Sequence, residues 1–248
     1  MLLKITNKCN LNCIHCLNGK SFERDMDWNT LRFAIEFINR IDCQYLVITG
    51  GEPTEHKDFL NIMNYICNNL KKVKCFTITS NGVYFENNPD FLKQLLNIDQ
   101  RINVQITNDI RYYPIQLNRK NKIYQLDRVV FCDKVEYVYP QGRALENNLE
   151  YKTNGSKCFN FIAILTQLTD KSISKTIQTL ERNSKYCTPQ IDVDGSLKPG
   201  ESSLCKKFGT IYDSEEELVQ NVLKFRCKQC DFINQKLPAP YRKLIHME

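Results

Sequence analysis

The sequence lacks any apolar run long enough to cross a membrane. Nowhere do eighteen apolar residues follow one another, and the apolar stretch 161–165 runs directly into polar residues. The first residues also lack the small-residue cleavage site of a secretory signal peptide. We therefore expect no membrane partner and a cytoplasmic location, where reducing conditions disfavour disulfide bonds.

The sequence is also too long and too poor in cysteine for a small disulfide-stabilised scaffold. It has 12 cysteines among 248 residues, a density below that of such scaffolds. Hydrophobic residues make up 42% of the chain, which excludes a wholly disordered protein. The formal net charge of +6 comes with no nucleic-acid-binding motif, so no nucleic-acid partner is expected. Clustered cysteines in a reducing compartment instead indicate metal ligands or catalytic groups.

Strand and helix patterns alternate along the first hundred residues. Each apolar strand pattern ends in a polar or glycine-containing segment, and a helical repeat of apolar residues follows it. Asp27 is a suitable N-cap for the first helix. Four such alternations predict an α/β fold with a parallel sheet that is closed or partly closed into a barrel. The expected strands are 2–6, 44–49, 74–79 and 102–107, and the expected helices are 28–41, 59–70 and 89–96.

The alternation weakens after Asp109, and the chain changes character again near residue 184. Residues 111–127 have no apolar helical face, so we expect a barrel helix to be missing there. A glycine-containing hairpin pattern at 191–197 then precedes a helical pattern at 215–225. We expect a first domain at 1–184 and a small second domain at 185–248. Further strands are expected at 129–131, 135–138 and 159–168, and a further helix at 173–180.

Three cysteines lie close together on the loop after the first strand. Cys9, Cys13 and Cys16 form a Cys-x3-Cys-x2-Cys motif. A cubane iron–sulfur cluster has four irons, so three thiolates leave one iron free to bind another group. Zinc with His15 as the fourth ligand is the alternative, but the position of His15 between Cys13 and Cys16 would strain a closed tetrahedral site. The spacing favours the cluster over zinc.

This cysteine loop resembles the signature of the radical S-adenosylmethionine (radical SAM) enzymes, and further segments typical of that family end the next three strands. The resemblance implies a partial (β/α)6 barrel, a [4Fe-4S] cluster on Cys9, Cys13 and Cys16, and S-adenosylmethionine (SAM) bound beside it. By resemblance, backbone groups of Gly50-Gly51-Glu52-Pro53 and the Glu52 side chain engage the methionine amino group of SAM. The same resemblance implies that Ser80 and Asn81 lie near the ribose, and that Thr107 and Asp109 reach the ribose and the carboxylate. It also implies that His15 lies beside the adenine.

The resemblance also implies a radical reaction. One electron from the reduced cluster breaks a carbon–sulfur bond of SAM, and the resulting 5′-deoxyadenosyl radical removes a hydrogen atom from the substrate. Iron–sulfur clusters span potentials of about −700 to +450 mV, and this chemistry requires the low end. A flavodoxin or ferredoxin is the implied electron donor.

A second set of cysteines lies in the last quarter of the chain. Its spacing resembles the auxiliary-cluster domains of the family, called SPASM with two clusters and twitch with one. Four cysteines suffice for one auxiliary [4Fe-4S] cluster, which favours a twitch-like domain. Cys158 is an alternative to Cys187 as the first ligand, and a zinc knuckle is the alternative for the whole set. The expected ligands are Cys187, Cys205, Cys227 and Cys230.

The remaining cysteines, Cys43, Cys67, Cys75 and Cys132, occur singly within expected strands and helices, and we interpret them as small buried hydrophobic residues. We expect His56 to be solvated or to cap a helix. The basic and aromatic segment 111–113 is expected to be a solvated loop, although it lies where a substrate would enter.

A compact chain with one auxiliary cluster resembles the radical dehydrogenases of aminocyclitol biosynthesis, in which the second cluster accepts an electron from the substrate radical. Oxidation of a small molecule is therefore the expected function. Peptide-modifying maturases are the alternative within the family, disfavoured because the sequence begins at the first expected strand with no leader-binding domain. A non-catalytic iron–sulfur or zinc protein is the alternative from another class, but it would not need Gly50-Gly51-Glu52-Pro53.

Overall fold

The structure of the protein is a computed structural model. This structure describes residues 1–135, 138, 142–150, 172, 189–198, 200 and 206–224. Several expected features lie outside these residues, namely the strand at 159–168, the helix at 173–180, the four cysteines proposed for an auxiliary cluster, and Cys158. The expectation of an auxiliary-cluster domain therefore remains a prediction.

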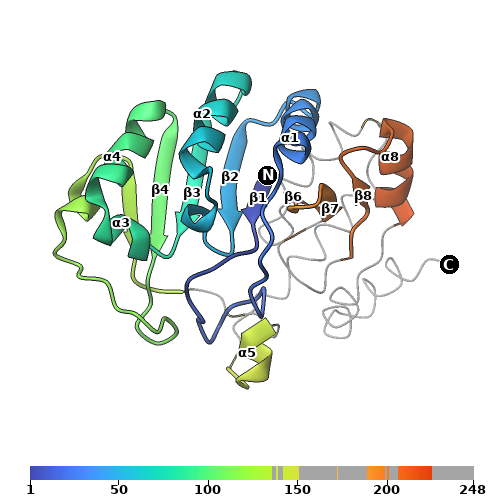
Figure 1. Cartoon of the computed structure of the whole chain (residues 1–248). Coiled ribbons are helices and arrows are strands. Elements are labelled where there is room, and N and C mark those ends of the chain that lie inside the picture. Colours follow the sequence, from blue (N-terminus) through green and yellow to red (C-terminus); the bar gives the residue numbers. More distant parts are fainter. Residues whose placement is uncertain are drawn as a thin grey trace, which may run out of the picture.

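Five parallel strands form the main part of one sheet (Figure 1). Each pairs with its neighbour in sequence, as expected for repeated strand-helix units. Three short strands extend the sheet beyond β1 in the order β5-β4-β3-β2-β1-β6-β7-β8. The strands are β1 (Leu2–Thr6), β2 (Tyr45–Gly50), β3 (Cys75–Ser80), β4 (Ile102–Thr107), β5 (Val129–Cys132), β6 (Gln190–Ile191), β7 (Ser196–Lys198) and β8 (Gly209–Thr210).

Helices cover one face of the parallel strands (Figure 1). The first begins at the predicted N-cap, where the Asp27 carboxylate accepts a hydrogen bond from the Thr30 amide at 2.7 Å. The connection from β4 to β5 contains only a short 3₁₀ helix, so the predicted loss of a barrel helix there is confirmed. The helices are α1 (Trp28–Arg40), α2 (Phe59–Asn69), α3 (Val83–Asn87), α4 (Pro89–Ile98), α5 (Gly142–Glu146) and α8 (Glu215–Lys224), with 3₁₀ turns η1 (Pro53–Glu55) and η2 (Lys122–Gln125).

Side chains of the strands alternate between two environments. Ile48, Ile78 and Ile106 are fully buried in the hydrophobic core. Their neighbours Thr49 and Thr79 point to the opposite face, because successive strand residues face opposite ways. That second face carries polar side chains at the carboxyl ends of the strands, where α/β folds place their functional sites.

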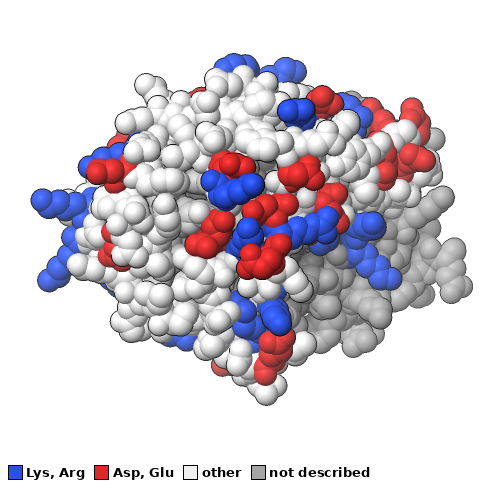
Figure 2. All heavy atoms as spheres, in the orientation of Figure 1, with Lys and Arg blue, Asp and Glu red and all other residues white. Residues whose placement is uncertain are grey.

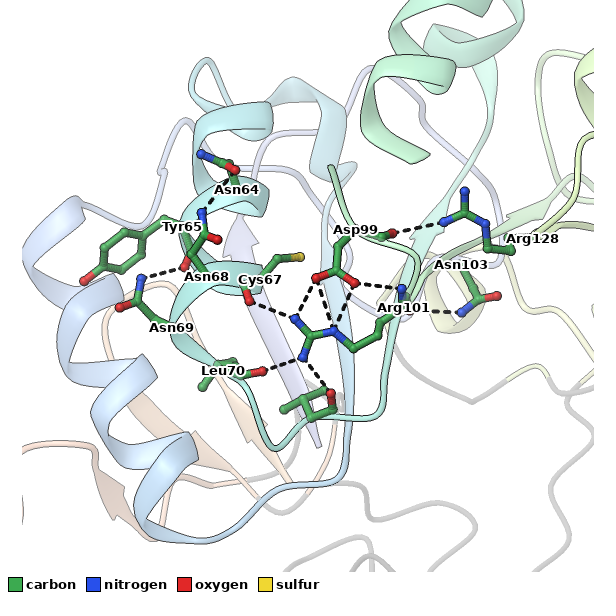
Figure 3. A network of polar contacts seen from close by, with 11 residues as sticks. Asn64, Tyr65, Cys67, Asn68, Asn69, Leu70, Asp99, Arg101, Asn103 and Arg128 are labelled. Carbon is green, nitrogen blue, oxygen red and sulfur yellow. Dashed lines mark hydrogen bonds and ion pairs between the residues drawn. The ribbon is translucent and has the colours of Figure 1, made fainter. Parts of the chain in front are cut away.

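Two arginines stabilise the opposite, amino-terminal edge of the sheet (Figure 3). The Arg101 guanidinium donates to the carbonyl oxygens of Cys67 and Leu70 at 2.8 Å each, and these residues end α2. Arg128 donates in the same way to the Leu96 carbonyl near the end of α4, at 3.0 Å. A cation is favourable at a helix carboxyl terminus because it offsets the partial negative charge of the unpaired carbonyls.

The predicted α/β fold is confirmed, and the hairpin predicted at 191–197 is observed as β6 and β7. This hairpin comes from the part of the sequence expected to form the second domain, yet β6 pairs in parallel with β1, with Leu3 beside Ile191. The hairpin therefore continues the sheet that β1 to β5 form. Charged side chains of both signs are interspersed over the face shown in Figure 2. In the described part of the chain no helix is long and apolar enough to span a membrane.

His56 is 3% exposed, and of its two expected roles the capping one is observed, because His56 is the C-cap of η1 and its ring accepts a hydrogen bond from the Asp58 amide, just before α2. Its other nitrogen lies 3.1 Å from the Met26 carbonyl, so His56 links the start of α2 to the segment before α1. Of the four cysteines expected to be buried, Cys43 and Cys67 are buried. For the other two the expectation was wrong, since Cys75 at the start of β3 and Cys132 at the end of β5 are half-buried.

Candidate functional site

A cavity of about 600 Å³ lies at the carboxyl ends of the parallel strands. The loop after β1, residues 7–22, contributes Cys9, Cys13 and Cys16 to its wall, and we call this segment the cysteine loop. The strand ends supply polar groups to the same wall. They are Thr49 in β2 with Gly51 and Glu52 after it, Thr79 and Ser80 in β3 with Asn81 after it, and Gln105 and Thr107 in β4.

Glu52 is the most deeply buried charged group in this wall, at 1% exposed. Its Oε1 accepts hydrogen bonds from the hydroxyls of Thr54 and Ser80, both at 2.9 Å. Its Oε2 accepts the Asn81 amide at 2.7 Å. Burial raises the pKa of the Glu52 carboxyl, and these hydrogen bonds oppose the shift. Because a carboxylate offers about four acceptor sites, Oε2 can accept one further donor from the cavity.

Two glycines let the end of β2 approach the cysteine loop closely. A Cβ on Gly51 would lie 2.2 Å from the Lys8 carbonyl oxygen, and one on Gly50 would lie 2.8 Å from that of Thr6. The approach permits two backbone hydrogen bonds, from the Gly51 amide to Thr6 at 2.9 Å and from the Glu52 amide to Lys8 at 2.7 Å. The paired glycines are therefore required here to attach the cysteine loop to β2.

His15 lies between two aromatic rings at the rim of the cavity. Its ring centroid is 5.1 Å from those of both Tyr112 and Tyr113. Burial lowers the pKa of His15 to about 4, so the ring is neutral at physiological pH. Its buried Nδ1 has no hydrogen-bond partner among the described residues, which leaves a polar atom for a ligand. The segment 111–113, expected to be solvated, thus contributes Tyr113 to the cavity wall.

Asp109, expected to reach SAM, does not line this cavity. Its carboxylate is 1% exposed and is paired with the Arg111 guanidinium, Nε to Oδ1 at 2.9 Å. It also accepts the Val135 amide at 2.8 Å. The Arg111 hydrogen bonds hold the pKa of Asp109 well below its usual range. In this structure Asp109 fixes the loop after β4, which carries the two tyrosines beside His15.

The three loop thiols line one cavity, and thiolates are the ligands that an iron–sulfur cluster takes, each on a separate iron. Burial raises the pKa of Cys13 to about 12 and also raises that of Cys9, so these two metal-free thiols are protonated. Cluster binding would displace the thiol protons.

Most of the predicted site residues therefore meet in one cavity. Cys9, Cys13, His15, Cys16, Gly51, Glu52, Ser80, Asn81 and Thr107 line it. Gly50 and Pro53 flank it through backbone structure, since Gly50 ends β2 and Pro53 begins η1.

The lining residues that the sequence analysis did not name as site residues include Gln105, Tyr113, Cys132 and Arg143. Gln105 could have been found from its place near the end of the strand expected at 102–107, and Cys132 from its place directly after the strand expected at 129–131. Arg143 gives no such signal, because its place depends on contacts with residues 130 positions earlier.

Comparison with known proteins gives a consistent family match. A profile described as the Radical SAM superfamily matches residues 3–180. An uncharacterized protein of Methanocaldococcus jannaschii is 29% identical over 109 residues, which are 43% of this chain and 37% of that protein. The mycofactocin maturase MftC of Mycolicibacterium smegmatis is 32% identical over 108 residues, 43% of this chain and 26% of the maturase. The chain thus spans well under half the length of these relatives.

Solved structures share the fold. BtrN in complex with AdoMet and 2-DOIA aligns with a TM-score of 0.56 and 15% identity, covering 94% of this chain and 85% of that one. Streptococcus suis SuiB bound to the precursor peptide SuiA aligns with a TM-score of 0.55 and 13% identity, covering 97% and 73%. At these identities the likeness concerns the fold alone.

Proposed function

Because the chain belongs to the Radical SAM superfamily, whose members bind a [4Fe-4S] cluster and SAM, we propose that it cleaves SAM reductively and oxidises a substrate. Cys9, Cys13 and Cys16 would hold the cluster. When bound, the cluster supplies one electron that breaks a carbon–sulfur bond of SAM, giving methionine and a 5′-deoxyadenosyl radical that takes a hydrogen atom from the substrate. A flavodoxin or ferredoxin would supply the electron.

One observation carries this proposal: three thiols and the buried Glu52 carboxylate line the same cavity of about 600 Å³. Glu52 is held by Ser80 and Asn81, so its free acceptor site has a fixed direction. An ammonium group of the ligand would be bound there by a charge-assisted hydrogen bond. The Nδ1 of His15, which has no hydrogen-bond partner among the described residues, could hydrogen-bond to the adenine.

The test is to reconstitute the protein anaerobically, add dithionite and SAM, and measure 5′-deoxyadenosine by mass spectrometry. The wild type should form it and Cys13→Ala should not. Cys75→Ala is the matched control, because Cys75 begins β3 at the opposite edge of the sheet. Glu52→Gln should keep the cluster but weaken SAM binding about tenfold or more, since it removes the charge within an unchanged shape. A wild type that binds iron and never cleaves SAM would refute the proposal.

For the substrate, we propose oxidation of a small molecule assisted by an auxiliary [4Fe-4S] cluster on Cys187, Cys205, Cys227 and Cys230. After hydrogen abstraction, the substrate radical would lose one proton and give one electron to the auxiliary cluster, a two-electron oxidation in all. The twitch-like spacing of these cysteines supports this proposal. The similarity to mycofactocin maturase favours a second candidate, a peptide substrate.

One measurement tests the auxiliary cluster, and another tests whether the substrate is a small molecule or a peptide. The triple variant Cys9→Ala, Cys13→Ala, Cys16→Ala should keep about four irons, the content of one cubane. Zinc retained in place of iron would refute the auxiliary cluster. Deuterium transfer into 5′-deoxyadenosine from deuterated candidate substrates, small molecules and peptides alike, would identify the substrate class.

A further inference from the structure

A segment far away in sequence contacts the cysteine loop directly. The helix α5 lies beside this loop at the carboxyl edge of the sheet (Figure 1). The Arg143 amide donates to the Cys16 carbonyl at 2.9 Å, and its Nε donates to the Cys13 carbonyl at 2.9 Å. The Asn147 side chain donates to the Ile14 carbonyl at 3.3 Å. Three backbone carbonyls within residues 13–16 of the cysteine loop therefore accept hydrogen bonds from one short segment.

Gly142 makes this contact sterically possible. Its φ is +51°, and a Cβ there would lie 2.5 Å from the Cys16 carbonyl oxygen and 2.6 Å from the Gly19 amide nitrogen. Both neighbours are backbone atoms that cannot rotate away. Glycine therefore brings the two backbones into contact, and Arg143 follows directly at the point of closest approach.

The charge of Arg143 has no acidic partner in the described part of the chain. Its guanidinium contacts two neutral oxygens, the Cys13 carbonyl and the Asn12 side chain, the latter at 3.3 Å. Arg101 and Arg111, by contrast, each pair with an aspartate. Arg143 lines the main cavity and also a second cavity of about 250 Å³, and Cys9 and Cys16 line both. As far as the described residues go, a cation without a carboxylate partner thus lies beside the thiols.

We propose that Arg143 is a positioning residue that fixes the cysteine loop and stabilises the reduced form of the cluster that the loop holds. The second part rests on the proposed function. A cubane with three thiolates carries a charge of about −1 when oxidised and about −2 when reduced by one electron. A nearby cation favours the more negative form, so Arg143 raises the reduction potential toward that of the electron donor.

The loop contact is tested first in the metal-free protein, by hydrogen–deuterium exchange of peptides covering the cysteine loop. Arg143→Met should speed amide exchange there at least tenfold, while Arg119→Met should leave it unchanged. Arg119 is the matched control because it is exposed and pairs with Asp133 at 2.9 Å. Equal exchange in the wild type and Arg143→Met would overturn the positioning role. Circular dichroism establishes that each variant is folded.

The electrostatic part is tested in reconstituted protein by titrating the electron paramagnetic resonance signal that changes when SAM is added. Arg143→Met should shift its midpoint potential negative by about 59 mV, a tenfold change in the one-electron equilibrium. Arg143→Lys keeps the charge, so its midpoint potential should lie close to that of the wild type. Its cysteine loop should still exchange faster than in the wild type. An unshifted potential in Arg143→Met overturns the electrostatic role. A wild type with no SAM-responsive cluster refutes the proposed function, and the exchange result still decides the positioning role.

Discussion

Replacing Arg101 by methionine should destabilise the protein strongly without touching the cavity. The guanidinium donates to the carbonyls of Cys67, Leu70 and Val73 at 2.8, 2.8 and 2.9 Å, and it pairs with Asp99 (Figure 3). The guanidinium carbon also lies 4.8 Å from the centroid of the Phe76 ring. Methionine removes the guanidinium and leaves three carbonyls and a carboxylate without their donor. A net hydrogen bond to a charged group contributes about 1.5–3 kcal/mol. Because both side chains of the pair remain about a fifth exposed, water replaces part of the lost hydrogen bonding. We expect the free energy of unfolding to fall by about 3–5 kcal/mol.

The assay is equilibrium unfolding in urea followed by circular dichroism at pH 7 and at lower pH. The Arg101 hydrogen bond lowers the pKa of Asp99 in the folded protein. That stabilisation is complete above the unfolded pKa of about 3.9 and is lost as the pH falls below it, so the difference between wild type and variant should shrink in acid. Lys93→Met is the control, because its pair with Asp90 is exposed and contributes below about 1 kcal/mol. A loss below about 1 kcal/mol in Arg101→Met would refute the reasoning.

Two further perturbations address the site itself. Gly51→Ala should abolish SAM binding, measured by equilibrium dialysis, and should lower the melting temperature. The reason is that its Cβ would lie 2.2 Å from the Lys8 carbonyl oxygen and separate β2 from the cysteine loop. Unchanged SAM binding would contradict the close approach. His15→Gln should flatten the loss of thermal stability between about pH 6.5 and pH 4. Burial lowers the folded pKa of His15 to about 4, so the unfolded chain binds more protons in this window and the wild type loses stability as the pH falls; an identical pH dependence in the variant would show that His15 is not the group responsible.

Local patterns predicted the strands and helices well, because each depends on residues close in sequence. The apolar positions of β1 to β4 and the N-cap at Asp27 lie in the printed sequence, and each requires only its own alternation or first turn. The cysteine spacing and Gly50-Gly51-Glu52-Pro53 likewise indicated the chemistry of the site. The prediction for Cys132 was wrong because the local pattern located β5 but did not show that Cys132 lines the cavity at the end of this strand.

Other features depend on partners that no local pattern specifies. Asp109 occupies the position expected of a ligand-binding carboxylate, yet Arg111 and the Val135 amide bind both of its oxygens. The second glycine of the pair, Gly51, was predicted as a cofactor contact, and the structure adds its close approach to the Lys8 backbone. In each case the decisive neighbour belongs to a different segment of the chain.

The sequence by itself determined the α/β alternation, the three-thiol loop and the polar strand ends, because residue type and short spacing suffice for a strand, a helix or a ligand motif. Only the tertiary structure decided which of these groups share a cavity and which are bound by their neighbours. Parallel pairing of β1 to β5 brings five strand ends to one edge. The helix α5, more than a hundred residues away in the sequence, places the Arg143 guanidinium beside Cys13, with no acidic partner among the described residues. Such contacts arise from packing between distant segments, which sequence spacing does not encode.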